Sequence, residues 1–444
     1  MKNYLEEGVT TMGTLLLLIM LIFEIAFAIY CMVTKLNHKK LKNWVRVAVF
    51  IAFVMLLLSS VIDWNFSWAI LTIVLFIFAV TGMSSLLYNK RNRQYKTSSI
   101  IWKTFVTILV LSIACAPAIV FPQYKSPKVT GTYQVATATY TYNDKNRMEE
   151  FTDKGDNRFV NVEFWYPKNA DKSYPLLVFS HGANGIKTSN TSTYTELASH
   201  GYVVVSLDHP YHSFYTVSDN GAKVFIDKGF NSEVSNSNKE GIYTNEEVYG
   251  LIQKWMKLRT DDMNFVIDTI RSKIKNDNDP LYQAIDIEKI GVFGHSMGGA
   301  ASVWLGGERK DVQAVVNIDA PFFSELVYKK EIDDFVARRE DYTTPLLNIY
   351  SDDVWKQLDS NSIYIANKPE NIHFKNAYTV HFQGAKHLSL TDLPLFSPIL
   401  ANMLQGGKAD IDKYYAIETE NELILNFFDF ELKGIGHFTP KETY

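Results

Sequence analysis

Hydrophobic residues are distributed very unevenly along this chain. Four stretches in its first quarter are almost wholly apolar: 13–34, 45–62, 67–88 and 98–121. A helix needs roughly 20 apolar residues to cross the ~30 Å hydrocarbon core of a bilayer. One such run is compatible with a signal peptide or a buried helix, but four in succession, joined by short polar loops, indicate a membrane domain. We therefore predict a four-helix transmembrane domain over residues 1–122.

Lysine and arginine residues predict the orientation of these helices. They gather in the first and third loops between the spans: Lys35, Lys39, Lys40, Lys42 and Arg46, then Lys90, Arg91, Arg93 and Lys96. The second loop has only Asp63 as a charged residue. Because positively charged loops stay in the cytoplasm, we expect the N-terminus, with Glu6 and Glu7, and everything after the fourth span to lie outside the cytoplasm.

Two further features of the spans change this picture little. The cysteines, Cys31 and Cys115, both fall inside predicted spans, so the outer part has no disulfide, which suits a bacterial cell membrane. Glu24 falls in the middle of the first span, where a charge is costly. We favour a packing role for Glu24 over a proton relay, because no second ionisable residue is expected at comparable depth in another helix.

The pattern changes after the fourth span. Residues 133–142 and 159–167 alternate between apolar and polar positions, as half-exposed strands do, and predict an antiparallel edge pair. Six short apolar runs follow, suited to parallel strands buried on both faces: 175–180, 202–207, 289–293, 313–318, 345–350 and 377–382. Helical stretches fall between most of them. This alternation predicts one α/β domain over residues 123–444, with a mostly parallel central sheet and helices on both faces.

One segment of the predicted outer domain breaks this alternation. Residues 213–286 separate two sheet strands by far more than a crossover requires. The segment begins polar and loop-like and then contains a long helical candidate with apolar residues at helical spacing. We predict a helical lid over the carboxyl edge of the sheet.

The stretch "IGVFGHSMGGAASVWLG" places Ser296 between two glycines where a strand turns directly into a helix. This Gly-x-Ser-x-Gly turn, the nucleophile elbow, exposes the serine hydroxyl at the edge of the sheet. Gly294 and Gly298 are expected where a side chain would collide with neighbouring backbone. The sequence therefore predicts Ser296 as a catalytic nucleophile.

A serine nucleophile requires a base and an acid that orients the base. His387 stands in the loop directly after the last predicted strand, "AYTVHF", and is the expected base. Two positions suit the acid. Asp319 follows the strand after the nucleophile strand, and Asp352 follows the next one, so spacing alone does not choose between them.

The reaction also needs hydrogen-bond donors for the oxyanion of the tetrahedral intermediate. The backbone N–H of Met297, at the start of the helix after the nucleophile, is one candidate. The loop "HGANG" after the strand 175–180 offers the second, the backbone N–H of Ala183. His181 in this loop precedes the nucleophile and is expected to shape the loop rather than to act as the base.

Several motifs of the outer domain carry a family resemblance. They are "FSHGANG", "ELASHGYVVVSLDHPYHS", "IDIEKIGVFGHSMGGA", "NIDAPFF" and "GAKHLSLTDL". In this order they resemble the plasma-type platelet-activating factor acetylhydrolases and their bacterial esterase relatives, over residues 157–435 but not over the membrane spans. The resemblance implies an α/β-hydrolase fold and a serine esterase. It places the nucleophile on Ser296 and the base on His387, favours Asp319 as the acid, and implies Met297 and Ala183 as oxyanion donors.

Composition and charge exclude some other classes of function. A net charge of -4 gives no electrostatic case for binding nucleic acid. Residues 275–280, "KNDNDP", lack the glycine and the terminal glutamate of a calcium loop, and no metal or cofactor is expected.

Together these patterns predict a serine esterase anchored in the membrane that hydrolyses carboxylic esters, such as short-acyl lipid or envelope esters. Two alternatives stay open. The acyl-enzyme could pass its acyl group to an envelope alcohol, which would make the protein an acyltransferase. The outer domain could also be a non-catalytic sensor coupled to the membrane helices.

Overall fold

The computed structural model describes residues 11–88, 95–169, 172–218, 220–369 and 373–444. Five charged residues used above to predict orientation lie outside the described residues: Glu6, Glu7, Lys90, Arg91 and Arg93. The chain forms two compact units. The first contains Met1–Lys125 and Leu395–Leu400, and the second contains Ser126–Pro394 and Ala401–Tyr444.

The first unit is built from four long helices. They are α1 (Met12–Thr34), α2 (Lys39–Leu58), α3 (Ala69–Leu87, preceded by the short turn η2, Phe66–Trp68) and α4 (Thr97–Val120). Each is long and apolar enough to cross a membrane. Large hydrophobic side chains such as Ile22 and Val33 are mostly exposed on the outside of this unit, as expected of a surface that faces lipid. Close helix contacts use small residues, as at Gly13 against Ala118.

Glu24 has an ionic partner that the sequence did not suggest. Lys42 Nζ lies 2.6 Å from Glu24 Oε2, and both side chains are largely buried. Lys42 belongs to the first turn of α2, but its long side chain extends along the helix to the depth of Glu24. The expectation that no ionisable group reaches Glu24 from another helix was therefore wrong. The Glu24–Lys42 pair is a contact between α1 and α2, which is consistent with the packing role favoured for Glu24.

A short segment from the C-terminal half of the chain belongs to this first unit. The Phe396 ring lies 5.1 Å from that of Phe121 and 6.2 Å from that of Phe66, and Ser397 Oγ donates to the Val120 carbonyl. These contacts join Leu395–Leu400 to the ends of α3 and α4.

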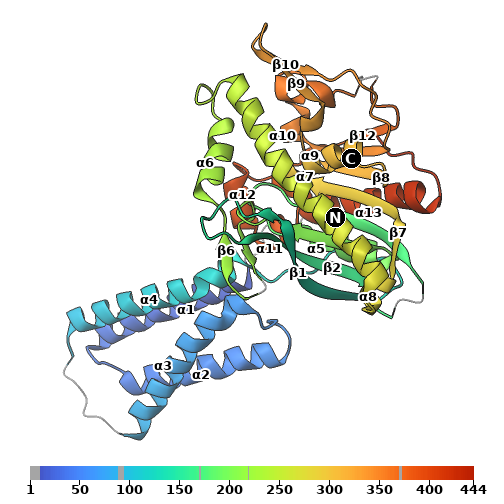
Figure 1. The fold of residues 1–444 in the computed structure, drawn as a ribbon. Helices are drawn as coiled ribbons and strands as arrows, with labels where there is room; N and C mark the ends of the chain where they lie inside the picture. Colours follow the sequence, from blue (N-terminus) through green and yellow to red (C-terminus); the bar gives the residue numbers. More distant parts are fainter. Residues whose placement is uncertain (1–10, 89–94, 170–171, 219, 370–372) are drawn as a thin grey trace. The chain divides into compact units, whose positions relative to one another are not determined.

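The second unit is organised around one eight-stranded sheet (Figure 1). In spatial order its strands are β1 (Val135–Met148), β2 (Asn157–Pro167), β4 (Val203–Asp208), β3 (Tyr174–Ser180), β7 (Ile285–His295), β8 (Val312–Ile318), β11 (Leu346–Ser351) and β12 (Ala377–Phe382). The β1–β2 and β2–β4 pairs are antiparallel, and all other neighbours are parallel. All eight runs predicted as strands lie in this sheet. Every residue of β3, β4 and β11 is buried, which explains why their sequences are mostly apolar.

Helices cover both faces of this sheet. The long helix α7 (Asn245–Asn276) and α9 (Met297–Glu308) pack with one set of buried side chains, and α5 (Thr191–Ser199) and α13 (Lys413–Phe428) pack with the other. Shorter elements outside the segment 213–286 are α10 (Asp352–Trp355), η3 (Phe323–Glu325), β9 (Leu326–Lys329), β10 (Asp334–Ala337), η4 (Ser362–Asn367), η5 (His387–Leu390), α11 (Leu393–Phe396), α12 (Pro398–Leu404) and the π-turn η6 (Asp429–Lys433).

The segment 213–286 is more regular than its polar sequence indicated. A small hairpin, β5 (Tyr215–Val217) with β6 (Lys223–Phe225), leads into α6 (Lys228–Ser237), α7 and α8 (Pro280–Gln283). The loop-like start expected from the sequence is therefore a hairpin followed by a helix. The second half of α7 is buried in the main core, where Met263, Val266 and Ile270 are fully covered. This helix thus supports the body of the domain as well as the predicted lid.

Candidate active site

Ser296 lies at a sharp turn between β7 and α9. Its backbone adopts φ 54° and ψ -128°, a strained conformation for a residue with a side chain. A Cβ on Gly298 would lie 1.9 Å from the Ser180 carbonyl oxygen, and one on Gly294 would lie 2.4 Å from the backbone of Gly298. Both glycines are therefore required by close backbone contacts, as the elbow motif predicts.

Asp319 and His387 meet at the same edge of the sheet. Asp319 directly follows β8 and is almost fully buried, and its Oδ2 lies 2.7 Å from His387 Nδ1. Ser351, at the end of β11, donates to Asp319 from both its backbone N–H (2.6 Å) and its hydroxyl (2.7 Å). These donors hold the carboxylate in place. Because Nδ1–H donates to Asp319, Nε2 of the neutral imidazole is left as a proton acceptor.

Ser296 and His387 are held near one another through the residue before the serine. His295 Nε2 donates to the His387 carbonyl (2.9 Å), and the two imidazole rings are 4.6 Å apart. Burial, followed by the neighbouring His387, lowers the pKa of His295 to about 3, so His295 is a neutral support. Among the described residues, Ser296 Oγ forms no hydrogen bond with the His387 ring. Such bonds often tighten only when substrate is bound.

Asp352 has different partners. Its Oδ1 pairs with His381 Nε2 (2.6 Å) and its Oδ2 with Lys356 Nζ (3.0 Å). Partial burial raises the pKa of this carboxyl, but the hydrogen bonds from Lys356 and His381 outweigh that effect and lower it. No contact among the described residues joins Asp352 to the His387 ring.

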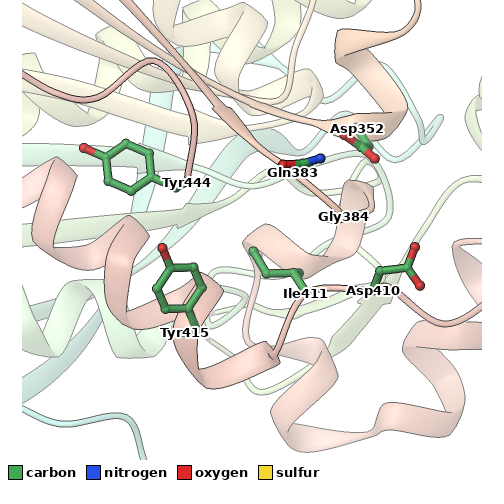
Figure 2. Close-up of a pocket in the computed structure, with 7 residues that line it drawn as sticks. All are labelled: Asp352, Gln383, Gly384, Asp410, Ile411, Tyr415 and Tyr444. Atoms are coloured by element: carbon green, nitrogen blue, oxygen red, sulfur yellow. The ribbon is translucent and has the colours of Figure 1, made fainter.

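The carboxylate of Asp352 lines a separate cavity of about 350 Å³. Figure 2 shows this cavity with Asp352 and Asp410 at one side and the rings of Tyr415 and Tyr444 at the other. Ser296, Asp319 and His387 do not line it. This placement argues against Asp352 as the acid that orients His387.

The loop after β3 lies directly against the nucleophile. A Cβ on Gly182 would lie 3.2 Å from the Ser296 Cβ, so a larger residue here would crowd the nucleophile and push it aside. His181 is fully buried, and its Nδ1 donates to the Gly182 carbonyl (2.6 Å). Burial, then the charge of Arg259, lowers the pKa of His181 well below its ordinary value. His181 therefore shapes the loop, as expected.

The two predicted oxyanion donors are Ala183 and Met297. Met297 is the first residue of α9, where backbone N–H groups have no partner within the helix. Within the described part of the chain, neither the Ala183 N–H nor the Met297 N–H donates to another protein group. Both amides are thus free to bind an anion beside Ser296.

A second Ser–His–Asp chain is present in the core. Asp262 Oδ2 lies 3.0 Å from His209 Nδ1, and His209 Nε2 lies 2.9 Å from Ser180 Oγ. All three side chains are inaccessible to solvent, and burial lowers the pKa of His209 to about 4. Asp262 also pairs with Arg158 at 2.7 Å. We interpret this group as structural, because no substrate can reach Ser180.

Two buried carboxyl groups lie behind the His387 loop. Asp392 accepts hydrogen bonds from the backbone N–H and the hydroxyl of Ser192, at the start of α5, and burial raises its pKa to about 6. Glu420, on α13, is almost fully buried, and its Oε1 has no hydrogen-bond partner among the described residues. Burial, and then the charges of Asp392 and Asp319, raise the pKa of Glu420 well above its ordinary value.

We expect Glu420→Gln to stabilise the protein increasingly as pH rises. A carboxyl whose pKa is raised by folding stabilises the folded state below its unfolded pKa, ~4.3, and that contribution is lost as pH rises through the folded pKa. The glutamine does not titrate. The Tm difference between variant and wild type should therefore grow by on the order of 3–6 °C from pH 5 to pH 9.

This prediction is checked by thermal unfolding of the full-length wild type and of Glu420→Gln in detergent, from pH 5 to pH 9. Glu422→Gln is the matched control, because Glu422 lies on the same helix but is exposed. A Tm difference for Glu420→Gln that stays flat with pH, as for the control, would contradict the raised pKa.

Comparison with known proteins assigns the chain to a family. Residues 160–437, more than half of the chain, match the family described as "Platelet-activating factor acetylhydrolase, isoform II". The chain belongs to this family. It is 26% identical over 278 residues to a platelet-activating factor acetylhydrolase from Canis lupus familiaris, which covers 60% of this chain and 59% of that protein. It is 25% identical over 277 residues to the one from Bos taurus, covering 59% and 58%.

The chain thus matches less than two thirds of the length of these platelet-activating factor acetylhydrolases. A solved structure, a ferulic acid esterase from Streptomyces cinnamoneus, matches 71% of this chain and 97% of its own, with a TM-score of 0.54 and 19% identity. At that identity the likeness shows the fold alone. The predicted α/β-hydrolase fold is confirmed, and the family match includes none of the four N-terminal helices.

Proposed function

We propose that this protein is a membrane-anchored serine esterase that hydrolyses carboxylic esters through an acyl-enzyme. The observation that carries the proposal is the hydrogen bond between buried Asp319 and His387, formed beside the strained elbow of Ser296. Family membership and the likeness to an esterase fold support it. The names of the relatives favour an acetyl or other short-acyl ester, in a lipid or an envelope polymer.

The proposed reaction proceeds in two halves. Ser296 Oγ attacks the ester carbonyl carbon while His387 Nε2 takes the hydroxyl proton, and Asp319 stabilises the resulting imidazolium. The N–H groups of Ala183 and Met297 bind the oxyanion of the tetrahedral intermediate. The intermediate collapses to the acyl-enzyme as His387 returns the proton to the leaving alcohol. Water, deprotonated by His387, then attacks the acyl-enzyme and releases the acid and free Ser296.

The first unit supports an integral membrane location, since all four helices have the length and apolarity of membrane spans. From the basic residues where α1 connects to α2, Lys35 in the loop and Lys39 and Lys40 at the start of α2, we propose that this connection is cytoplasmic. An even number of spans then puts the N-terminus and the hydrolase unit on the outer face, of a bacterial cell in our proposal. The substrate would be an ester met at that face.

The test uses the full chain in lipid nanodiscs and p-nitrophenyl esters from acetyl to palmitoyl. We expect turnover that is highest for acetyl and falls with acyl length. A fluorophosphonate probe should label the protein, with the adduct located on the peptide that contains Ser296 by mass spectrometry. Absence of turnover on every ester together with absence of labelling would refute the esterase and favour a non-catalytic role.

A further inference from the structure

Arg259 is a buried cation whose direct hydrogen-bond partners are all neutral oxygens. It lies on α7, its side chain is inaccessible to solvent, and no carboxylate of the described residues forms a salt bridge with it. Its hydrogen-bond partners lie at the end of β3 and in the loop that follows: Nη1 donates weakly to Ser180 Oγ, at 3.4 Å, and the closer contacts are with the loop. Nη1 donates to the His181 carbonyl, and Nη2 donates to the Gly182 carbonyl at 3.3 Å. A buried guanidinium is costly unless it is well compensated, and here the two carbonyls compensate it directly while the charge of buried Asp262 contributes without a salt bridge.

The Gly182 carbonyl is held from several sides. Besides Arg259, it accepts from His181 Nδ1 (2.6 Å) and from the backbone N–H of Gly185 (3.2 Å). The Gly185 contact closes a tight turn in which Asn184 has a left-handed φ of 61°. These donors fix the direction in which the Gly182 carbonyl points.

That direction determines where the next N–H points. In a planar trans peptide the carbonyl oxygen and the following N–H point in opposite directions. Donors that hold the Gly182 oxygen therefore aim the Ala183 N–H the opposite way. Gly182 lies against the Ser296 Cβ, and the Ala183 N–H has no acceptor among the described residues. The peptide that Arg259 holds is thus the one predicted to bind the oxyanion.

We propose that Arg259 is a positioning residue that orients the Gly182–Ala183 peptide, so that the Ala183 N–H is preorganised to bind the oxyanion formed at Ser296. This inference rests on the proposed esterase function. Arg259 touches neither substrate nor the reacting atoms and acts only through this peptide. Burial lowers the pKa of its guanidinium to about 9, which leaves it protonated at pH 7. Its charge beyond the carbonyl also polarises the peptide and strengthens the N–H as a donor.

The test separates orientation of the oxyanion site from general stability. Arg259→Met, in full-length protein in nanodiscs, keeps an unbranched side chain but removes the donors and the charge. With p-nitrophenyl acetate we expect kcat to fall by about 10- to 100-fold, below the ~10²–10³-fold cost of deleting a donor outright, while KM changes by less than about 3-fold. The inhibition constant of a trifluoromethyl ketone, whose serine adduct carries an oxyanion, should rise by the same factor as kcat falls.

Two further variants make the result decisive. Met256→Ala removes a fully buried apolar side chain one turn earlier on α7, which makes no hydrogen bond with this loop, and should lower Tm without weakening the binding of the trifluoromethyl ketone. Arg259→Lys keeps the charge and part of the donation. It provides the measurement if Arg259→Met does not fold, with kcat and ketone affinity expected to fall together by about 10-fold.

Several outcomes would overturn the proposal. The first is a wild-type kcat in Arg259→Met or, where that variant does not fold, in Arg259→Lys. The second is a lower kcat with an unchanged affinity for the ketone. The third is a loss of kcat and ketone affinity in Met256→Ala as large as in the Arg259 variant. Failure of the proposed function looks different, because the wild-type protein itself would then hydrolyse no ester and bind no ketone at Ser296.

Discussion

Replacing Ser296 by alanine is expected to reduce kcat for p-nitrophenyl acetate by about 10⁴- to 10⁶-fold. The variant removes the only atom that forms the acyl-enzyme, while the amides of Ala183 and Met297 remain. Those donors can still polarise a bound ester for attack by water, so a small residual rate should persist. Because the hydroxyl forms no hydrogen bond with the His387 ring, the loss should come without a large change in Tm. The measurement is steady-state turnover beside thermal unfolding.

A matched control lies six residues further along the chain, inside the helix that Ser296 caps. Ser302 lies within α9 and is fully buried, unlike the partly exposed Ser296, and its hydroxyl donates only to the Gly298 carbonyl at 2.9 Å. Ser302→Ala should keep kcat within about 3-fold, since a surface or buried hydroxyl on a helix contributes ~1 kcal/mol to stability and nothing to the chemistry. Undiminished fluorophosphonate labelling of Ser296→Ala would disprove Ser296 as the nucleophile.

The sheet could be predicted from sequence because its central strands are buried on both faces. Burial on both faces produces short, continuously apolar runs, and each of the six predicted runs lies in a parallel strand of the sheet. The nucleophile elbow could also be predicted from the sequence. The glycines on both sides of Ser296 are required by contacts with backbone a few residues away and with the neighbouring strand β3.

The hairpin and α6 were missed for a physical reason. Their sequence is polar and short, and the contacts that order them come from elsewhere in the chain. Phe230 of α6 stacks on His212 at 3.6 Å and meets Trp255 of α7 edge-on at 6.1 Å. Helix and strand propensities of the local sequence do not reveal such distant contacts.

Arg259 and Asp262 illustrate a second limit. Both residues lie on α7, which is rich in lysine, glutamate and aspartate. In such a sequence, charged residues are normally expected to face solvent. Both are in fact fully buried, because Arg259 binds loop carbonyls and Asp262 pairs with Arg158 and His209. Only the three-dimensional placement of the loop and of β2 shows these partners.

The identity of the acid was undecided by spacing because Asp319 and Asp352 follow adjacent parallel strands. What separates them is side-chain direction. Asp319 adopts a left-handed φ of 57°, receives two hydrogen bonds from Ser351 and faces His387. Asp352 starts α10 and pairs with His381 and Lys356 instead. The sequence does not show in which direction either aspartate side chain points. The choice of Asp319 over Asp352 as the catalytic acid therefore stays a prediction, to be tested by measuring activity.

We therefore expect Asp319→Asn to lower kcat by about 10⁴-fold and Asp352→Asn to lower it by less than about 10-fold. An asparagine at 319 presents an amide N–H₂ or a neutral oxygen to His387 Nδ1, so it no longer stabilises the imidazolium and allows the tautomer with Nε2 protonated, which cannot accept the Ser296 proton. Asp352→Asn only weakens a partly exposed pairing, worth ~0–1 kcal/mol of stability.

Both variants are to be measured in the full chain for kcat, Tm and the rate of fluorophosphonate labelling. Asp319→Asn also weakens the bonds from Ser351, so a loss of Tm alone would not distinguish a structural role. Labelling does, because phosphonylation of Ser296 requires the same proton acceptor as ester cleavage and should slow in parallel with kcat at a temperature where the variant is folded. The reverse pattern, slow labelling in Asp352→Asn and normal labelling in Asp319→Asn, would move the acid to Asp352. It would then require the His387 loop to rearrange before substrate is cleaved, since the ring contacts Asp319 in the structure described.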